Sequence, residues 1–440
     1  MRFTKFGKAL SMGVLSAGVI FGVTSCVESY TVGFLYVTGT VTASTGSSGI
    51  ISGYKIDHNT GQLTPVNGLP VSSGGANPVR AFLTDSSRFL YVLNRGANAS
   101  GSGDCYGTGA NECENSNIVE FAVGGNAILT PQETFYSQGI NPFRILSDTT
   151  GNYLYVLDHD APSNAACALA LGSSAKTCGD ITVFSVNSST GRLQLVVNAQ
   201  VTAANGSALT YFPVPANPID FVLNSGYIFT LTGTPATGDT VFPYAEAAST
   251  GQLTVTQNGA QALNIAQASA IVSGSSYLYV LDDEPITANG TTSSSQILPF
   301  LVGTGGALQP QIGGIVPDDP TLSNPNYLLV ESKGKFLYVL NEGNNTSTTN
   351  AQSGLAGYVI DPSTHVLSYI AGEPFGTGAG PQCLVEDPSN QFIYTADFND
   401  SAVTGRVVDP NSGVLNNLRV TNTYSLSGPA AWCLVDGRTD

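Results

Sequence analysis

One short segment recurs along this chain and constrains its fold more than any other feature. The pattern Phe/Tyr-Leu-Tyr-Val-Leu occurs four times, and weaker copies bring the total to seven. The copies lie at 34–37, 88–94, 152–158, 226–230, 276–282, 335–341 and 391–395. Their starts are roughly 50 to 75 residues apart, and repeats of about this period indicate a propeller or a solenoid.

Each copy belongs to a unit of four short expected strands. An extended run that usually opens with Asn-Pro precedes the copy, as at 77–83 and 141–146, and a tight turn joins the two. An alternating strand and a Thr-Gly turn follow, as at 181–186 and 189–191. Glycine supplies positive φ in such turns at no steric cost. No segment has the period and length of a helix.

The two ends of the chain complete the pattern. The first copy has no extended run before it, and the chain ends with an unpaired run of the same kind at 430–436. Placing this run beside 34–38 closes a ring. The sequence therefore predicts an all-β fold: one seven-bladed propeller of four-stranded antiparallel blades over residues 26–440, closed by the C-terminal strand joining the N-terminal blade.

The first 25 residues are expected to be a lipoprotein signal peptide. Arg2, Lys5 and Lys8 precede a short apolar run, and Val-Thr-Ser leads into Cys26. Cys26 would be the lipidated first residue of an exported protein anchored in the bacterial cell envelope, and Val27 after it favours the outer membrane. The protein would contact the membrane only through this lipid anchor. An ordinary signal peptide with a coincidental cysteine is the alternative.

The remaining six cysteines suit an oxidising compartment. Two pairs are close in sequence within Gly/Ser/Asn-rich loops and are expected as loop staples: Cys105–Cys113 and Cys167–Cys178. Cys383 and Cys433 fall in register on the first strands of the last and closing blades, where a bridge would lock the ring; two free buried thiols are the alternative. The sequence contains no CxxC motif and no histidine at ligand spacing, so the cysteines do not indicate a metal site. No cofactor is expected, although the sequence leaves open whether a divalent cation binds.

Charge excludes one class of partner. The chain carries a net charge of −16, and only 10% of its residues are charged while 42% are hydrophobic. Such an acidic protein repels phosphate backbones, so a nucleic-acid partner is not expected. The apolar content argues against disorder, and a monomer is expected.

Three charged residues hold equivalent positions on successive first strands: Arg80, Arg144 and Asp220. Their side chains should point to the central channel, where an unpaired charge is costly. Two adjacent arginines could grip a carboxylate or a phosphate bidentately. Alternatively, the three residues neutralise one another in a hydrated pore.

Polar residues end the recurring strand on the face that also carries the long loops. We expect Asn94, Asp282, Asn341 and Asp397 at the channel mouth as candidate substrate-binding residues. Asp158, His159 and Glu342 are expected on the same face, where clustered carboxylates could activate a water. Clustered carboxylates could also bind a cation. Acidic residues after a strand can equally be solvated turn formers, and a single loop histidine can be incidental.

The blade units resemble those of the seven-bladed lactonase propellers, a family that includes bacterial 6-phosphogluconolactonase and carboxymuconate-lactonising enzymes. The resemblance covers essentially the mature chain and rests on the Pro-x-x-x-apolar-turn-Phe-Leu-Tyr-Val unit and on Tyr-Lys-Ile-Asp with Thr-Gly-Gln-Leu at 54–63. Family members commonly carry a histidine two residues after the proline; here Arg80, Arg144, Asp220 and Cys383 stand there.

The resemblance implies hydrolytic opening of a small-molecule lactone. Arg80 and Arg144 would hold an anionic group or polarise the carbonyl, and Asp158, His159 or Glu342 would be the base. A non-catalytic envelope propeller that binds a glycan, a peptide or a protein is the competing hypothesis, because one fold hosts both.

Overall fold

The structure is a computed structural model. It describes residues 30–41, 48–84, 86–97, 113–172, 174–203, 205–233, 238–288, 290–311, 314–343 and 352–437. Residues from Thr31 onward form one compact unit, distinct from Met1–Tyr30. The expected signal peptide at 1–25 and Cys26 lie outside the described residues. In the part described, no helix is long and apolar enough to cross a membrane.

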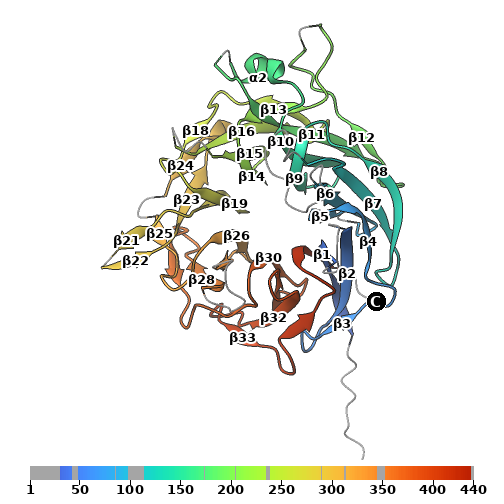
Figure 1. Ribbon diagram of the computed structural model, residues 1–440. Coiled ribbons are helices and arrows are strands. Elements are labelled where there is room, and N and C mark those ends of the chain that lie inside the picture. Colours follow the sequence, from blue (N-terminus) through green and yellow to red (C-terminus); the bar gives the residue numbers. More distant parts are fainter. Residues whose placement is uncertain are drawn as a thin grey trace, which may run out of the picture. The chain divides into compact units, whose positions relative to one another are not determined.

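Seven antiparallel sheets of four or five strands surround a central axis in the described part of this unit, which confirms the predicted propeller (Figure 1). The first three blades, innermost strand first, are β35 (Ala430–Asp436), β1 (Thr31–Thr40), β2 (Ser48–Asp57), β3 (Leu63–Pro65) and β4 (Val71–Ala76); β5 (Pro78–Leu83), β6 (Phe89–Asn94), β7 (Asn117–Val123) and β8 (Leu129–Phe135); and β9 (Ile140–Ser147), β10 (Tyr153–Asp160), β11 (Cys178–Val186), β12 (Leu193–Leu195) and β13 (Phe212–Pro215).

The other four blades follow in chain order. They are β14 (Pro218–Asn224), β15 (Tyr227–Thr232), β16 (Thr240–Ala247), β17 (Gln252–Val255) and β18 (Gln261–Ala262); β19 (Ala268–Gly274), β20 (Tyr277–Asp282), β23 (Gln296–Val302), β24 (Leu308–Pro310) and β25 (Val316–Pro317); β26 (Pro325–Val330), β27 (Phe336–Asn341), β28 (Gly354–Ile360) and β29 (Leu367–Tyr369); and β30 (Pro381–Glu386), β31 (Phe392–Asp397), β32 (Ala402–Val408), β33 (Leu415–Asn417) and β34 (Thr423–Ser425).

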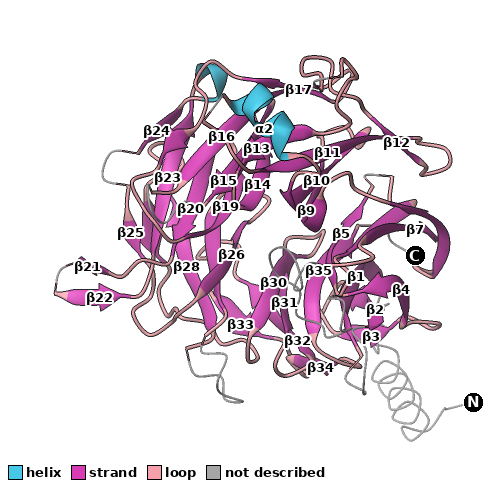
Figure 2. Cartoon of the chain, turned by 45° about the horizontal axis from the view of Figure 1, so that its top comes forward, coloured by secondary structure: helices cyan, strands magenta, loops and turns pink. Residues whose placement is uncertain are grey.

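Two features differ from the sequence expectation. In five blades the fourth strand is broken into two short pieces that both pair with the third strand, as β12 and β13 do with β11. Two loops expected to be irregular also contain regular structure: the helix α2 (Asn164–Leu171) and the hairpin of β21 (Ile286–Ala288) and β22 (Thr291–Ser293) (Figure 2). The helix packs beside β13, where Ala166 and Cys167 are buried with Leu209 and Tyr211.

The ring closes as predicted. Strand β35 pairs with β1, with Phe34 opposite Asp436 and Thr38 opposite Trp432. The expected disulfide Cys383–Cys433 is present, with Cα atoms 5.7 Å apart, and joins the neighbouring strands β30 and β35. Cys167–Cys178 is also present. Cys113 is disulfide-bonded, but its expected partner Cys105 lies outside the described residues.

Contacts between blades explain the recurring aromatic pattern. The first aromatic residue of a second strand packs against a tight turn of the next blade: a Cβ added to Gly413, which has φ of 75°, would lie 2.6 Å from the Phe336 ring. The tyrosine two residues on, Tyr338, donates to the carbonyl oxygen of the same glycine at 2.7 Å. The same close approach of ring and glycine recurs at Phe392–Gly61, Phe89–Gly191 and Tyr153–Gly251.

Two blades use another residue in this turn. Ala127 and His365 adopt φ of 61° and 56°, the left-handed region that glycine occupies elsewhere. Tyr36 donates to the carbonyl of Ala127 at 3.0 Å, and the His365 ring stacks on Tyr277 with centroids 4.0 Å apart. His365 therefore holds two blades together and has a structural role.

We expect Gly413→Ala to destabilise the protein more than Gly334→Ala. Both glycines have positive φ, so each substitution costs about 1 kcal/mol through the backbone. Only Gly413 faces an aromatic ring, whereas a Cβ on Gly334 meets nothing within 4 Å. The clash should cost a further 1–3 kcal/mol or so. Urea unfolding of both variants measures the difference, and equal losses would contradict the assigned inter-blade contact.

Candidate functional site

Seven residues hold equivalent positions on the innermost strands. Each of these strands carries a bulge at its start, so that in β5 Pro78 pairs with Asn94 but Arg80 pairs with Leu93. The residue after the bulge is equivalent in all seven blades. We call these residues the axial ring: Arg80, Arg144, Asp220, Ala270, Tyr327, Cys383 and Trp432.

The Asn-Pro motif sets up this bulge. Asn77 and Asn324 have φ of 51° and 54°, a region that asparagine tolerates better than most residues. Their side-chain amides donate to the carbonyls of Gly96 and Gly343 at 2.7 and 2.6 Å. The asparagine thus ties the start of the innermost strand to the loop after the second strand.

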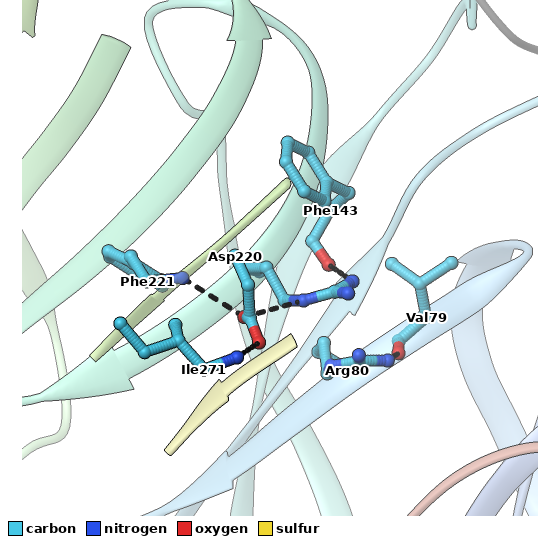
Figure 3. A network of polar contacts seen from close by, with 7 residues as sticks. Val79, Arg80, Phe143, Asp220, Phe221 and Ile271 are labelled. Atoms are coloured by element: carbon cyan, nitrogen blue, oxygen red, sulfur yellow. Dashed lines mark hydrogen bonds and ion pairs between the residues drawn. The ribbon is translucent and has the colours of Figure 1, made fainter. Parts of the chain in front are cut away.

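Arg144 and Asp220 form an ion pair across two blades. Arg144 Nε lies 2.9 Å from Asp220 Oδ1, and Arg144 also donates to the carbonyl of Phe143 at 3.2 Å. Asp220 accepts further bonds from the backbone N–H groups of Phe221 and Ile271 at 3.0 and 3.3 Å (Figure 3). These contacts from Arg144, Phe221 and Ile271 fix the orientation of the Asp220 carboxyl group.

Arg80 is held without a carboxylate. Its guanidinium donates to the carbonyl of Val79 at 2.8 Å (Figure 3). The same guanidinium lies over the Trp432 ring, with Cζ 3.8 Å from the centroid. Tyr327 packs edge-to-face on the same indole, with centroids 5.2 Å apart. Among the described residues, no carboxylate lies within ion-pair distance of Arg80. The remaining N–H groups of its planar fork are therefore suited to an external anion.

The electrostatics of the axial ring favour an added negative charge. Burial, and then the neighbouring Arg144 cation, lower the pKa of the Arg80 guanidinium well below its ordinary value, and Asp220 offsets this only in part. Burial raises the pKa of Tyr327 despite the opposing effect of Arg80. Tyr327 is thus a neutral phenol that can donate a hydrogen bond.

A second ring lies one step further along the same strands. Two residues beyond each axial position, every blade has an apolar side chain on the same face of its strand, half-buried and packed against one of the core clusters. We call these residues the apolar ring: Phe82, Leu146, Val222, Val272, Leu329, Val385 and Leu434. The polar groups of the axial ring are therefore followed by an apolar wall.

His159 lies at the end of β10, near Phe143, the residue before Arg144. Its ring centroid is 6.3 Å from that of Phe143, and the Arg144 guanidinium lies 5.2 Å from the same Phe143 ring. His159 Nδ1 is 2.9 Å from Asp160 Oδ2, which also accepts from Asn141 at 3.3 Å. The hydrogen bond from His159 lowers the pKa of Asp160, so that this carboxylate stays ionised. The side chain of His159 is 33% exposed.

The strand-end residues lie elsewhere than expected. Asn94, Asp158, Asp282, Asn341 and Asp397 are fully buried rather than open at the channel mouth. Their side chains bond to neighbouring loops and strands: Asn94 accepts from Ser73 at 2.6 Å, and Asn341 donates to Asp318 at 3.0 Å. These contacts hold blades together, and they leave the five residues no open face for a substrate.

Glu342 is half-buried in blade six, at the start of the loop after β27. His159 belongs to blade three, so the two expected bases are not neighbours around the ring. Within the described residues, no group of three or more His, Cys, Asp or Glu residues is arranged to hold a metal ion.

Blade three contains a buried pair of carboxylates. Asp158 and Asp180 stand directly opposite each other on β10 and β11, and one oxygen of each has no hydrogen-bond partner. Burial raises the pKa of Asp158 to about 7. Burial and the Asp158 charge raise the pKa of Asp180 well above its ordinary value. In blade five the same position is filled by an amide, since Gln296 donates to Asp282 at 2.6 Å.

We expect Asp180→Asn to stabilise the protein at pH 8 and to change little at pH 4. The folded-state pKa values lie above the unfolded ones, so the stabilisation by the protonated pair is complete below about pH 4 and is lost as pH rises through about 7. An amide can donate to Asp158 at every pH. We expect roughly 1–3 kcal/mol at pH 8 in urea unfolding; an equal effect at both pH values would contradict the pairing.

Of the predicted site residues, Arg80, Arg144 and Asp220 lie at equivalent positions of neighbouring innermost strands, and the Phe143 ring lies near both Arg144 and His159. The sequence did not single out Tyr327 and Trp432 of the axial ring, nor the hydrogen bond between His159 and Asp160. The available signal was positional: Tyr327 follows Pro325 by two residues, as Arg80 follows Pro78. Trp432 lies next to Cys433 on the closing strand.

The protein is a seven-bladed propeller whose innermost strands carry two arginines, a tyrosine and a tryptophan at equivalent positions. Residues 311–431 match the family described as Lactonase, 7-bladed beta-propeller. With the observed fold, this match confirms the resemblance drawn from the blade motifs. No curated protein matches the chain significantly.

Similar solved structures cover nearly the whole chain. A putative 6-phosphogluconolactonase from Bacteroides fragilis aligns with a TM-score of 0.64 and 14% identity over 93% of this chain and 99% of its own. The periplasmic gluconolactonase of Pseudomonas aeruginosa aligns with 0.62 and 17% identity over 91% and 99%. A hypothetical selenium-binding protein from Sulfolobus tokodaii reaches 0.59 at 11% identity over 93% and 94%. At such identities these likenesses show the fold alone.

Proposed function

We propose that this protein is a lactonase-type hydrolase that opens a small-molecule lactone at the axial ring. The observation that carries this proposal is the pair of adjacent guanidinium groups, of which Arg80 has no carboxylate partner among the described residues, one aromatic ring away from an oriented histidine. The family match over residues 311–431 supports the reaction class. Water is the only co-reactant that the reaction needs.

The arrangement assigns a role to each group. Arg80 and Arg144 bind the anionic group of the substrate or the carbonyl oxygen, which becomes an oxyanion when attacked. With Nδ1–H donated to Asp160, the other nitrogen of His159, Nε2, is the basic one. It accepts a proton from water as the water oxygen bonds to the carbonyl carbon. The ring C–O bond then breaks, and the leaving oxygen takes the proton back from the imidazolium, which yields a hydroxy acid.

We further propose that the protein acts outside the cytoplasm, anchored in the cell envelope through Cys26. The two described disulfides, Cys167–Cys178 and Cys383–Cys433, support an oxidising compartment. The N-terminal sequence supports export.

Hydrolysis of a panel of aldonolactones and phosphorylated or carboxylated lactones by the soluble protein truncated at Cys26 tests the reaction. We expect turnover well above the spontaneous rate. His159→Ala should lower kcat/KM by about 10²- to 10⁴-fold as a lost base, and Arg144→Ala by about 10²- to 10³-fold as a lost oxyanion or substrate contact.

Arg192→Gln is the matched control, because Arg192 is 70% exposed and pairs with Glu133 in an outer turn; it should retain full activity. A folded protein without turnover on any lactone would refute the proposed function. Full activity in His159→Ala would instead transfer the role of base to another group, with Asp220 the first candidate.

A further inference from the structure

The charges of the axial ring indicate how many negative charges its ligand carries. The ring contains two cations, Arg80 and Arg144, and one anion, Asp220, which is paired with Arg144 at 2.9 Å. Tyr327 is neutral because burial raises its pKa. One positive charge is therefore uncompensated. A ligand with one negative charge neutralises it, whereas a phosphate dianion leaves an excess negative charge in a partly desolvated site.

The geometry of Arg80 favours a planar anion. The guanidinium is fixed on one face by the Trp432 indole and on one edge by the carbonyl of Val79. What remains is an edge of N–H donors in a plane, which matches the two oxygens of a carboxylate.

The surroundings favour an apolar body for this ligand. The aromatic rings of Tyr327 and Trp432 lie beside Arg80, and every position of the apolar ring beneath is Phe, Leu or Val. The hydroxyl groups of a sugar would find no side-chain hydrogen-bond partner in that ring, and unpaired polar groups lose roughly 1–3 kcal/mol each. An apolar body instead gains by burial.

We propose that the axial ring recognises the single carboxylate of a ligand with an apolar body, so that the substrate class is a monocarboxylated, apolar lactone and not a phosphorylated sugar lactone. The lactone part of this statement rests on the proposed function, while the carboxylate and the apolar body rest on the axial ring and the apolar ring themselves.

The chain contains a single tryptophan, Trp432, so its fluorescence reports on the axial ring alone. We would titrate the protein at pH 8 with hexanoate, with gluconate, which has the same six-carbon skeleton but bears hydroxyl groups, and with hexyl phosphate, which is a dianion. We expect hexanoate to bind at least about tenfold more tightly than either of the others, a difference of about 1.4 kcal/mol.

Two variants separate the contributions. Arg80→Gln should abolish the preference for hexanoate over hexanol, while Arg192→Gln, remote and exposed, should leave it unchanged. Val222→Thr, a nearly isosteric change in the apolar ring, should reduce the preference for hexanoate over gluconate several-fold. Gluconate or hexyl phosphate binding as tightly as hexanoate, no binding by any of the three, or an unchanged Arg80→Gln would each overturn the proposal.

The outcome is distinguishable from that of the hydrolysis assay, because hexanoate is not a lactone. Hexanoate binding without turnover of any lactone would refute the proposed reaction and retain the ligand class. Turnover of a phosphorylated sugar lactone without hexanoate binding would support the proposed reaction and refute the ligand class.

Discussion

The contact between a strand-opening aromatic ring and a left-handed turn of the next blade is the interaction on which the rest of this propeller depends. A blade cannot bury both faces alone, so the ring is stable only where neighbouring sheets pack closely. Gly413 lets the turn approach the Phe336 ring, and Tyr338 then satisfies the carbonyl of the same glycine at 2.7 Å. The strand-opening aromatic residue thus supplies packing, and the tyrosine two residues later supplies a buried hydrogen bond. The repetition of these two contacts around the ring accounts for the recurring aromatic pattern in the sequence.

Ring closure is the second constraint, and it is met by chain ends far apart in sequence. Strand β35 completes the blade that β1 begins, and the Cys383–Cys433 disulfide joins β35 to the preceding innermost strand. The same strand carries Trp432, on which the Arg80 guanidinium lies at 3.8 Å. Strand β35 therefore both closes the ring and orients the Arg80 cation.

Much of the fold could be predicted because the sequence repeats its structural requirements. The unpaired run at 430–436 predicted the closure of the ring, which the structure confirms. The Cys383–Cys433 disulfide is also confirmed, but the register from which it was predicted is wrong by one residue: Trp432 is equivalent to Cys383, and the next residue, Cys433, forms the bridge. The burial of the strand-end polar residues could not be predicted, because it depends on loops from other parts of the chain. Gly139 and Gly378 illustrate this: a Cβ on them would lie 2.2 Å from Asp180 and 2.5 Å from Asp397, so these loops cover the carboxylates only because the residues are glycine. The helix α2 was missed because its eight residues are too few for a helical period.

The sevenfold repetition itself separates structure from function in this chain. Equivalent positions of the seven blades face nearly the same structural demand, so positions that serve the fold should carry similar residues. The apolar ring does so, since each member is Phe, Leu or Val. One step along the same strands, the axial ring contains Arg, Asp, Ala, Tyr, Cys and Trp, although its backbone bulge is the same in every blade. Apart from Cys383, whose disulfide joins two innermost strands, the fold does not require this variety, and burying the Arg80 cation without its own carboxylate costs stability. A cost that the repeat could avoid with an aliphatic side chain is best explained by a ligand that the axial ring binds.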